Sequence, residues 1–239
     1  MEKISSLFSK IKDKGIKHII TETIPEIMCD KLDKYVTAIV KRIYINKPIK
    51  NVIILESHND FDSNGGAFYE YLLQNGYNKR YKIVWFLRNK CPKNLPHNVE
   101  SYRYNRLSVK RVYYHCIARY ILSEHYAIPA IRDGQIAIFM RHGAGGLKNA
   151  AKFIALPGGI QYILGLSKKY APIENLQKLF TNENQKIIYL GFPSHDYLFK
   201  NNDSELKKIT KNKYKKTILW MPTFRKGLYN RNDSNVELH

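Results

Sequence analysis

The chain has 239 residues, and its 40 Lys and Arg against 20 Asp and Glu give a formal net charge of +20 at neutral pH. Hydrophobic residues make up 44% and charged residues 25%, a globular composition that excludes a disordered chain. No apolar run reaches the ~20 residues of a membrane span, and the first residues lack the apolar core of a secretory signal. Three cysteines without a close pair disfavour a disulfide scaffold or a cysteine-based zinc site.

Half of the net charge lies in one short segment. Lys79 to Arg119 hold eleven basic residues and one acidic residue, Glu100. Interleaved basic and aromatic residues of this kind bind nucleic acid, anionic lipid headgroups or a polyphosphate. The alternative is a solvated basic face with the aromatic residues in the core. Because no helix-turn-helix, RRM or KH signature is present, nucleic acid is the least favoured partner.

Two basic amphipathic helices are predicted first, over residues 2–20 and 25–45. Their apolar residues follow helical spacing, with lysines between them. Such a pair either lies on a membrane surface or packs against the domain that follows.

From Pro48 onward, short apolar runs alternate with helical patterns. Helices are predicted over residues 65–75, 108–118 and 172–180, and strands over 52–55, 82–87, 99–102, 119–123, 135–140, 162–166, 186–190 and 216–220. Alternation of this kind predicts an α/β fold with a doubly wound, Rossmann-like parallel sheet. In such folds the functional residues gather in loops that follow the carboxyl ends of the strands.

Two of these loops carry candidate chemistry. The loop that begins at Glu56 concentrates polar groups before a helix, although an ordinary turn capped by Asp62 or Ser63 explains it as well. The segment RHGAGGLK, from Arg141, has a glycine-rich turn whose amides can approach a phosphate. His142 lies where a proton can be exchanged near neutral pH. The other histidines have no ligand-like spacing, so no metal site is predicted.

Four sequence blocks occur in order between residues 52 and 225. They read ILESHNDFDSNGGAFYEYL, QIAIFMRHGAGGLK, GFPSHDYL and LWMPTFR. In this order they resemble the blocks of the CDP-glycerol glycerophosphotransferases, the teichoic-acid and capsule polymerases of bacteria. The departures are Arg141 in place of the family's Trp, one extra residue in the glycine turn, and Ser194-His195 in place of Arg-Asn.

The resemblance implies a GT-B arrangement, in which two α/β lobes face a cleft and the donor nucleotide lies mainly on the second lobe. Residues 1–47 would then be basic amphipathic helices, residues 48–200 the acceptor-side lobe, and residues 201–239 the start of a second, truncated lobe.

The resemblance also implies a reaction, in which a hydroxyl of a lipid-linked polyanionic acceptor attacks the β-phosphorus of CDP-glycerol or another CDP-polyol and CMP leaves. His142 matches the family's histidine and would be the catalytic base. The expected substrate-binding residues are Glu56, Asp62, Asn64, Gly143, Gly145, Gly146, Lys148, Asp196 and Arg225. No cofactor beyond the donor substrate is expected.

The expected location is the cytoplasm, peripheral on the inner face of the bacterial cell membrane. The alternative is a non-catalytic remnant that binds anionic membrane or polymer through its basic face. Oligomeric state is left open.

Overall fold

The computed structural model describes residues 24–44, 46–89, 91–104, 106–142 and 155–200, together with the single residues 16, 20, 21, 208, 216 and 218. Residues 26–200 form one compact unit, and residues 1–25 with 201–239 form another. The helix predicted over residues 2–20 and the strand predicted over 216–220 fall outside the continuous described ranges. The description below concerns the unit of residues 26–200.

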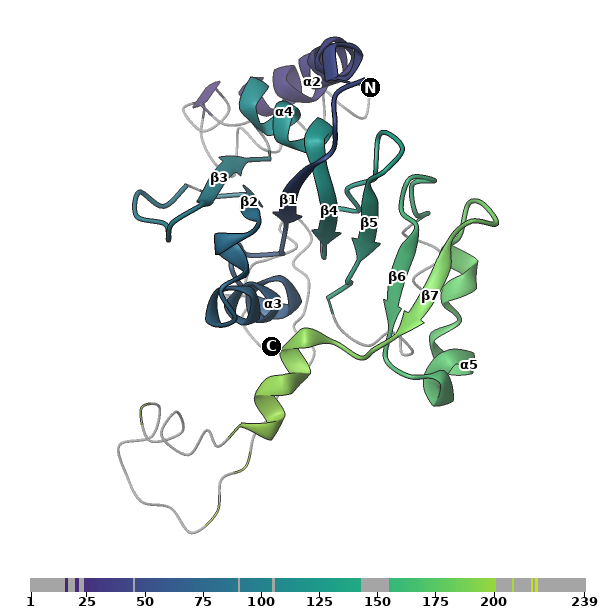
Figure 1. Cartoon of the computed structure of the whole chain (residues 1–239). Coiled ribbons are helices and arrows are strands. Elements are labelled where there is room, and N and C mark those ends of the chain that lie inside the picture. Colours follow the sequence, from purple (N-terminus) through teal and green to yellow (C-terminus); the bar gives the residue numbers. More distant parts are fainter. Residues whose placement is uncertain are drawn as a thin grey trace. The chain divides into compact units, whose positions relative to one another are not determined.

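The centre of this unit is a parallel sheet of seven strands in the order β3-β2-β1-β4-β5-β6-β7 (Figure 1). The strands are β1 (Lys50–Leu55), β2 (Lys82–Leu87), β3 (Val99–Arg103), β4 (Ala118–Ser123), β5 (Ile136–Phe139), β6 (Tyr162–Gly165) and β7 (Lys186–Tyr189). Each pair of neighbours is parallel. The predicted doubly wound α/β fold is therefore confirmed.

Both faces of the sheet are buried, because successive side chains of each strand point to opposite sides. In β1, Val52 and Ile54 belong to one core cluster, whereas Ile53 and Leu55 belong to the other. Helices α2 (Ile24–Tyr44) and α4 (Val109–Ile117) contribute to the first cluster, and α3 (Ser63–Gln74) contributes to the second. The near-continuous apolar strands of the sequence follow from this two-sided burial.

Helix α2 is attached to the unit by one buried side chain and two polar contacts. Val40 is buried in the first core cluster. Asp33 forms an ion pair and hydrogen bond with the buried Arg111 of α4. Arg132 donates hydrogen bonds to the carbonyl oxygens of Tyr44 and Lys47, which fixes the end of the helix. One face of α2 is therefore committed to the core and the opposite face is left to solvent.

The crossover connections leave β1 and β4 in opposite directions. The β1-α3-β2 connection runs toward β3, and the β3-α4-β4 connection returns to the other side of β1. The sheet order thus reverses between β1 and β4, and the crevice outside their carboxyl ends is where open α/β sheets bind ligands.

The strand predictions agree with the structure to within one or two residues, and the helix predicted over 172–180 is wrong as a single element. In its place lie α5 (Ala171–Glu174) and a 3-10 turn, η5 (Leu176–Leu179). Asn175 between them adopts the left-handed conformation with φ of 46°, and this ends the α-helix.

At Gly159 the loop before β6 lies directly against the backbone of Ala130, in the loop after β4. A Cβ atom at Gly159 would lie 2.3 Å from the backbone oxygen of Ala130, whereas one at Gly158 would meet side-chain atoms, Nδ2 of Asn182 at 2.9 Å and Oγ1 of Thr181 at 4.0 Å. We expect Gly159→Ala to lower the free energy of unfolding by about 1–3 kcal/mol, because a backbone cannot yield as a side chain can. Urea denaturation measures this, with Gly158→Ala as the matched control. Equal effects of both substitutions would contradict it.

Candidate functional site

The candidate site lies at the carboxyl ends of β1, β4 and β5, where the sheet order reverses. Three loops meet there, and they begin at Glu56, Glu124 and Met140. The strand ends are joined directly, since the Glu56 amide donates to the Leu122 carbonyl at 3.1 Å and the Met140 amide to the Ser123 carbonyl at 2.7 Å. The three loops of the site therefore start from hydrogen-bonded strand ends.

Glu56 is 1% exposed and holds the loop after β4. Its Oε2 accepts hydrogen bonds from the amides of Glu124 at 2.9 Å, His125 at 2.9 Å and Tyr126 at 3.1 Å. Burial raises the pKa of this carboxyl to about 7, because desolvation outweighs the three hydrogen bonds that favour the charged form. The side chain expected to bind substrate is thus committed to the protein's own backbone.

Glu124 is a second buried carboxyl beside Glu56, and it is fully buried. Its Oε2 accepts a hydrogen bond from the Gly65 amide at the start of α3, at 2.9 Å. Among the described residues, Oε1 of Glu124 and Oε1 of Glu56 have no hydrogen-bond partner. Burial raises the pKa of Glu124 as well. Burial thus favours the protonated form of both carboxyls.

Asn64 joins three of the four sequence blocks that carry the family resemblance. Its Nδ2 donates to the Arg141 carbonyl at 2.7 Å, and its Oδ1 accepts from the Ser194 hydroxyl at 2.7 Å and the Ser194 amide at 3.2 Å. Asn64 is 1% exposed. The loops after β1, β5 and β7 therefore meet at one amide side chain.

His142 is exposed at the end of the described β5 loop. Its Nδ1 lies 3.3 Å from the carbonyl oxygen of Glu124. A carbonyl oxygen only accepts hydrogen bonds, so Nδ1 carries the proton in this contact. In the neutral ring Nε2 is then unprotonated and able to take a proton, which is the tautomer that a general base needs.

Two further histidines surround His142, and the sequence did not predict them as site residues. Nδ1 of His58 lies 3.0 Å from Nδ1 of His125. The His142 ring centroid is 5.7 Å from that of His58 and 5.5 Å from that of His125. Their positions shortly after β1 and β4 could have predicted that they belong to the site, because neighbouring parallel strands end at the same edge of a sheet.

Arg141, which stands where the related family has Trp, is buried. Its guanidinium forms an ion pair with Glu174 at 2.8 Å and donates to the Leu164 carbonyl at 3.3 Å. Glu174 in turn accepts from the Leu166 amide at 3.0 Å. Arg141 has a φ of 63°, an uncommon value for a residue other than glycine, and its carbonyl is the one that Asn64 binds. This backbone conformation sets the direction in which His142 leaves β5.

Two of the remaining predicted site residues, Asp62 and Asp196, lie in the part of the chain that the structure describes. Asp62 occupies the cap position of α3, and its carboxylate binds the Asn59 amide at 3.1 Å and the Asn59 side chain at 3.0 Å instead of the helix. Asp196 is exposed on the 3-10 segment η6 (Pro193–Phe199). Gly143, Gly145, Gly146, Lys148 and Arg225 lie outside the described residues.

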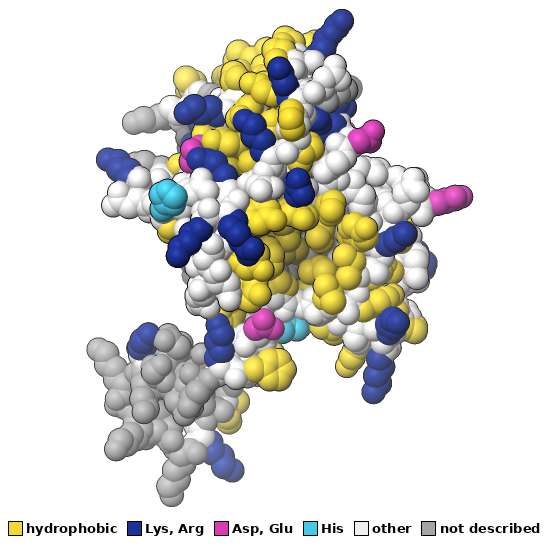
Figure 2. Space-filling view, viewed as in Figure 1, with side chains coloured by type: hydrophobic (Ala, Val, Ile, Leu, Met, Phe, Trp, Pro, Cys, Tyr) yellow, Lys and Arg dark blue, Asp and Glu magenta, His cyan; other side chains and the backbone are white. Residues whose placement is uncertain are grey.

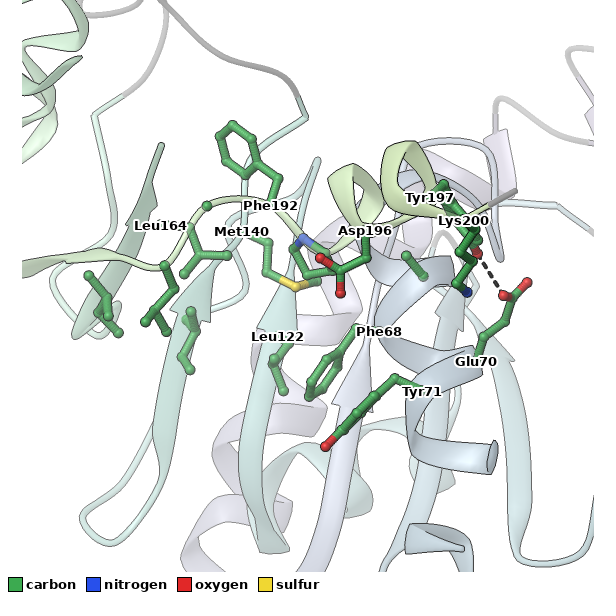
Figure 3. Close-up of a pocket in the computed structure, with 16 residues that line it drawn as sticks. Phe68, Glu70, Tyr71, Leu122, Met140, Leu164, Phe192, Asp196, Tyr197 and Lys200 are labelled. Carbon is green, nitrogen blue, oxygen red and sulfur yellow. Dashed lines mark hydrogen bonds between the residues drawn. The ribbon is translucent and has the colours of Figure 1, made fainter. Parts of the chain in front are cut away.

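Asp196 lines an apolar cavity of about 470 Å³ on the α3 side of the sheet (Figure 3). Its walls include Phe68 of α3, Leu122 of β4 and Leu164 of β6. The Tyr197 hydroxyl donates to Glu70 at 2.6 Å, which ties η6 to α3 at this cavity. Figure 2 shows hydrophobic side chains gathered in a hollow of this face, with Lys and Arg side chains around it.

In the part of the chain that the structure describes, no group of three or more His, Cys, Asp or Glu side chains is arranged to hold a metal ion. Within the same residues, no helix is both long enough and apolar enough to cross a membrane.

The raised pKa of Glu56 predicts a stability that depends on pH. Between its ordinary value of 4.5 and about 7 the folded state binds more protons than the unfolded state, so this group's contribution falls as pH rises through that window. Glu56→Gln keeps an acceptor oxygen for the three amides and cannot ionise. We expect the free energy of unfolding of Glu56→Gln to exceed that of the wild type at pH 8 and not at pH 4.5. The excess at pH 8 is about 3 kcal/mol at most.

Chemical denaturation at the two pH values measures this difference, and Glu183→Gln, which changes an exposed loop carboxyl, is the control. If the wild type and Glu56→Gln differ equally at both pH values, folding does not raise the pKa of Glu56.

Comparisons with known proteins identify the family of this chain. A family model described as CDP-Glycerol:Poly(glycerophosphate) glycerophosphotransferase matches residues 39–239. No match was found among curated proteins.

The similar solved structures include those of the wall teichoic acid polymerase TagF. One has 16% identity and a TM-score of 0.57, with 86% of this chain and 52% of that chain covered. A histidine-to-asparagine variant soaked with CDPG has 19% identity and a TM-score of 0.62, with 85% and 56% covered. The chain thus spans about half the length of these TagF chains, and at such identities the likeness shows the fold. The family match extends over most of the sequence, and the chain belongs to the CDP-glycerol:poly(glycerophosphate) glycerophosphotransferase family.

Proposed function

We propose that the chain takes part in the transfer of polyol phosphate from CDP-glycerol, or another CDP-polyol, to a teichoic-acid or capsule acceptor. In this reaction a hydroxyl oxygen of the acceptor forms a bond to the β-phosphorus of the donor. The bond from that phosphorus to the bridging oxygen breaks, and CMP leaves with the electron pair. The acceptor's hydroxyl proton goes to the protein. Family membership supports the reaction class.

His142 is the proposed base, and its hydrogen bond to the Glu124 carbonyl is the observation that carries this role. The bond leaves Nε2 as the acceptor nitrogen of a neutral ring. His142 lies at the carboxyl end of β5 beside the reversal of the sheet order, where ligands bind in this class of fold. A positioned general base contributes about 10²–10⁴-fold to a rate.

The phosphate oxygens are proposed to bind to the residues that follow His142 in the sequence. Gly143, Gly145 and Gly146 offer amides without side chains, and Lys148 offers a positive charge. Arg225 is proposed to contact phosphate as well, since a guanidinium matches the geometry of phosphate oxygens.

For the acidic and amide residues of the site, two different roles are proposed. Asp62 and Asp196 have carboxylates at the surface that can accept hydrogen bonds from hydroxyl groups of a polyol. Glu56 and Asn64 are buried, with hydrogen bonds to loop backbone, and we propose that they support the substrate site from beneath.

The acceptor is proposed to be lipid-linked and polyanionic, with the protein bound peripherally to the inner face of the cell membrane. Large apolar side chains of α2 support this. Ile27, Met28, Leu32, Tyr35, Ile39 and Ile43 recur at helical spacing, and each is between 42% and 71% exposed. Lys34 and Arg42 are exposed on the same helix. Figure 2 shows hydrophobic and basic side chains together at the end of the molecule where α2 lies. Apolar and basic groups on one helix favour an anionic lipid surface.

Exposed basic side chains outside α2 support the alternative function, in which the chain binds anionic membrane or polymer without catalysis. In the segment from Lys79 to Arg119, the side chains of Arg80, Arg88, Lys93, Lys110 and Arg119 are exposed. In both functions the chain binds an anionic membrane or polymer. They differ in whether His142 takes part in a reaction.

The role of His142 is tested by CMP release from CDP-glycerol in the presence of a lipid-linked acceptor. The assay uses the chain alone and the chain mixed with the nucleotide-binding half of a family member. We expect His142→Ala to lower the rate by about 10²-fold or more, because the acceptor hydroxyl loses its base. His97→Ala, an exposed histidine at the opposite edge of the sheet just before β3, should change nothing. Full activity of His142→Ala would remove it from the mechanism, and no release under either condition would favour the non-catalytic alternative.

Membrane binding through α2 is tested by sedimentation with phosphatidylglycerol vesicles. We expect the double substitution Tyr35→Glu with Ile39→Glu to weaken binding about tenfold or more, since two apolar side chains no longer enter the interface. Ile173→Glu, which changes an equally exposed isoleucine on α5, is the control. Binding of the wild type should fall as salt rises and be weak on phosphatidylcholine vesicles. Unchanged sedimentation of the double variant would exclude α2 as the contact.

A further inference from the structure

The three histidines of the site form one packed cluster drawn from three different loops. His58 follows β1, His125 follows β4 and His142 follows β5. The rings of His58 and His142 are stacked, with 19° between their planes, whereas His125 meets His58 edge to face at 4.3 Å between centroids. Each ring therefore limits the orientations that are open to the other two.

The contact between His58 and His125 holds a single proton. The two Nδ1 atoms are 3.0 Å apart, a hydrogen-bond distance, and only one of them can be the donor. The pKa of His125 is lowered to about 4, by burial first and then by the nearby charges of His58, His142 and Arg88. His125 is consequently a neutral ring at physiological pH.

His125 is also fixed from beneath. Its amide is one of the three that the buried Glu56 carboxylate binds, and the neighbouring Glu124 provides the carbonyl that contacts His142. The turn of residues 124–126 thus carries both contacts: the carbonyl that selects the tautomer of His142, and the ring that orients His58 against it. Three charged or titratable side chains lie near the histidine cluster. Glu56 and Glu124 are buried beneath it, and Arg88 directly follows β2.

We propose that His125 is a positioning residue for His142, acting through its hydrogen bond to His58, so that the stacked His58 ring holds His142 with Nδ1 on the Glu124 carbonyl and Nε2 toward the substrate. The inference rests on the proposed function in so far as His142 is the base of that reaction. It adds two residues, His58 and His125, to the site. In this role His125 acts on His142 through His58.

A neutral His125 also explains why an imidazole suits this position. Its Nδ1 can accept a hydrogen bond from His58 or donate one to it, and in either case the ring stays neutral beside His142. A permanent cation at this distance would oppose the uptake of the acceptor's proton by His142. A phenyl ring fills similar space but removes the hydrogen bond, whereas an asparagine amide nitrogen or oxygen can replace Nδ1.

The experiment compares His125→Phe with His125→Asn in the full chain. The readout is the ring-nitrogen NMR spectrum of His142, assigned by its loss in His142→Ala. In the wild type we expect His142 as the Nδ1-protonated tautomer. In His125→Phe we expect a mixture of both tautomers, because His58 no longer holds the ring, and in His125→Asn we expect the wild-type spectrum. His58→Phe removes the other partner of the same bond and should reproduce the His125→Phe result, which covers the case in which His125→Phe does not fold.

Transfer kinetics give a second, separate readout. His125→Phe should lower kcat about tenfold or more with KM changed less than about twofold, and His125→Asn should restore most of the loss. An unchanged His142 spectrum in His125→Phe or His58→Phe would overturn the inference, whether or not the protein transfers. A changed spectrum without any transfer activity would leave the positioning intact and count against the proposed function.

Discussion

One carboxylate oxygen joins the two halves of the sheet where their connections diverge. Oε2 of Glu56, directly after β1, binds three consecutive amides after β4. Those amides leave a strand end, so they have no ladder partner, and a buried unpaired amide is costly. With this turn held, the Glu124 carboxylate reaches the start of α3, its carbonyl reaches His142, and the His125 ring reaches His58. The contacts of the candidate site therefore depend on the buried carboxyl of Glu56.

The sequence was sufficient for the strands and for the place of the site. Buried parallel strands have near-continuous apolar runs, so Lys82–Leu87 was predicted at its observed bounds. Because function gathers after the carboxyl ends of such strands, Glu56 and His142 were predicted to lie in the functional loops, and they do lie at the same edge of the sheet. The sheet order and the meeting of these loops are tertiary facts that no local pattern contains.

The partners of the site residues lie outside the reach of sequence patterns. Glu56 and Glu124 are 68 residues apart, and His58 and His125 are 67 residues apart. A spacing rule finds ligands on one helix or in one loop, and it therefore dismissed His125. The broken helix at Asn175 has a different cause. In this segment Asn175 alone adopts the left-handed conformation that ends the helix. The apolar residues on both sides of it keep helical spacing, so the sequence pattern does not reveal the break.

The buried ion pair between Arg141 and Glu174 makes the side chains at these two positions depend on each other. The Arg141 side chain is 10% exposed and that of Glu174 is 1% exposed, so a loss of either partner leaves a buried charge uncompensated, at a cost of about 3–5 kcal/mol. A tryptophan at position 141, as in the related blocks, would leave the Glu174 carboxylate without this cation. A change at either position is therefore best matched by a change at the other, because the Arg141 backbone also begins the loop that carries His142.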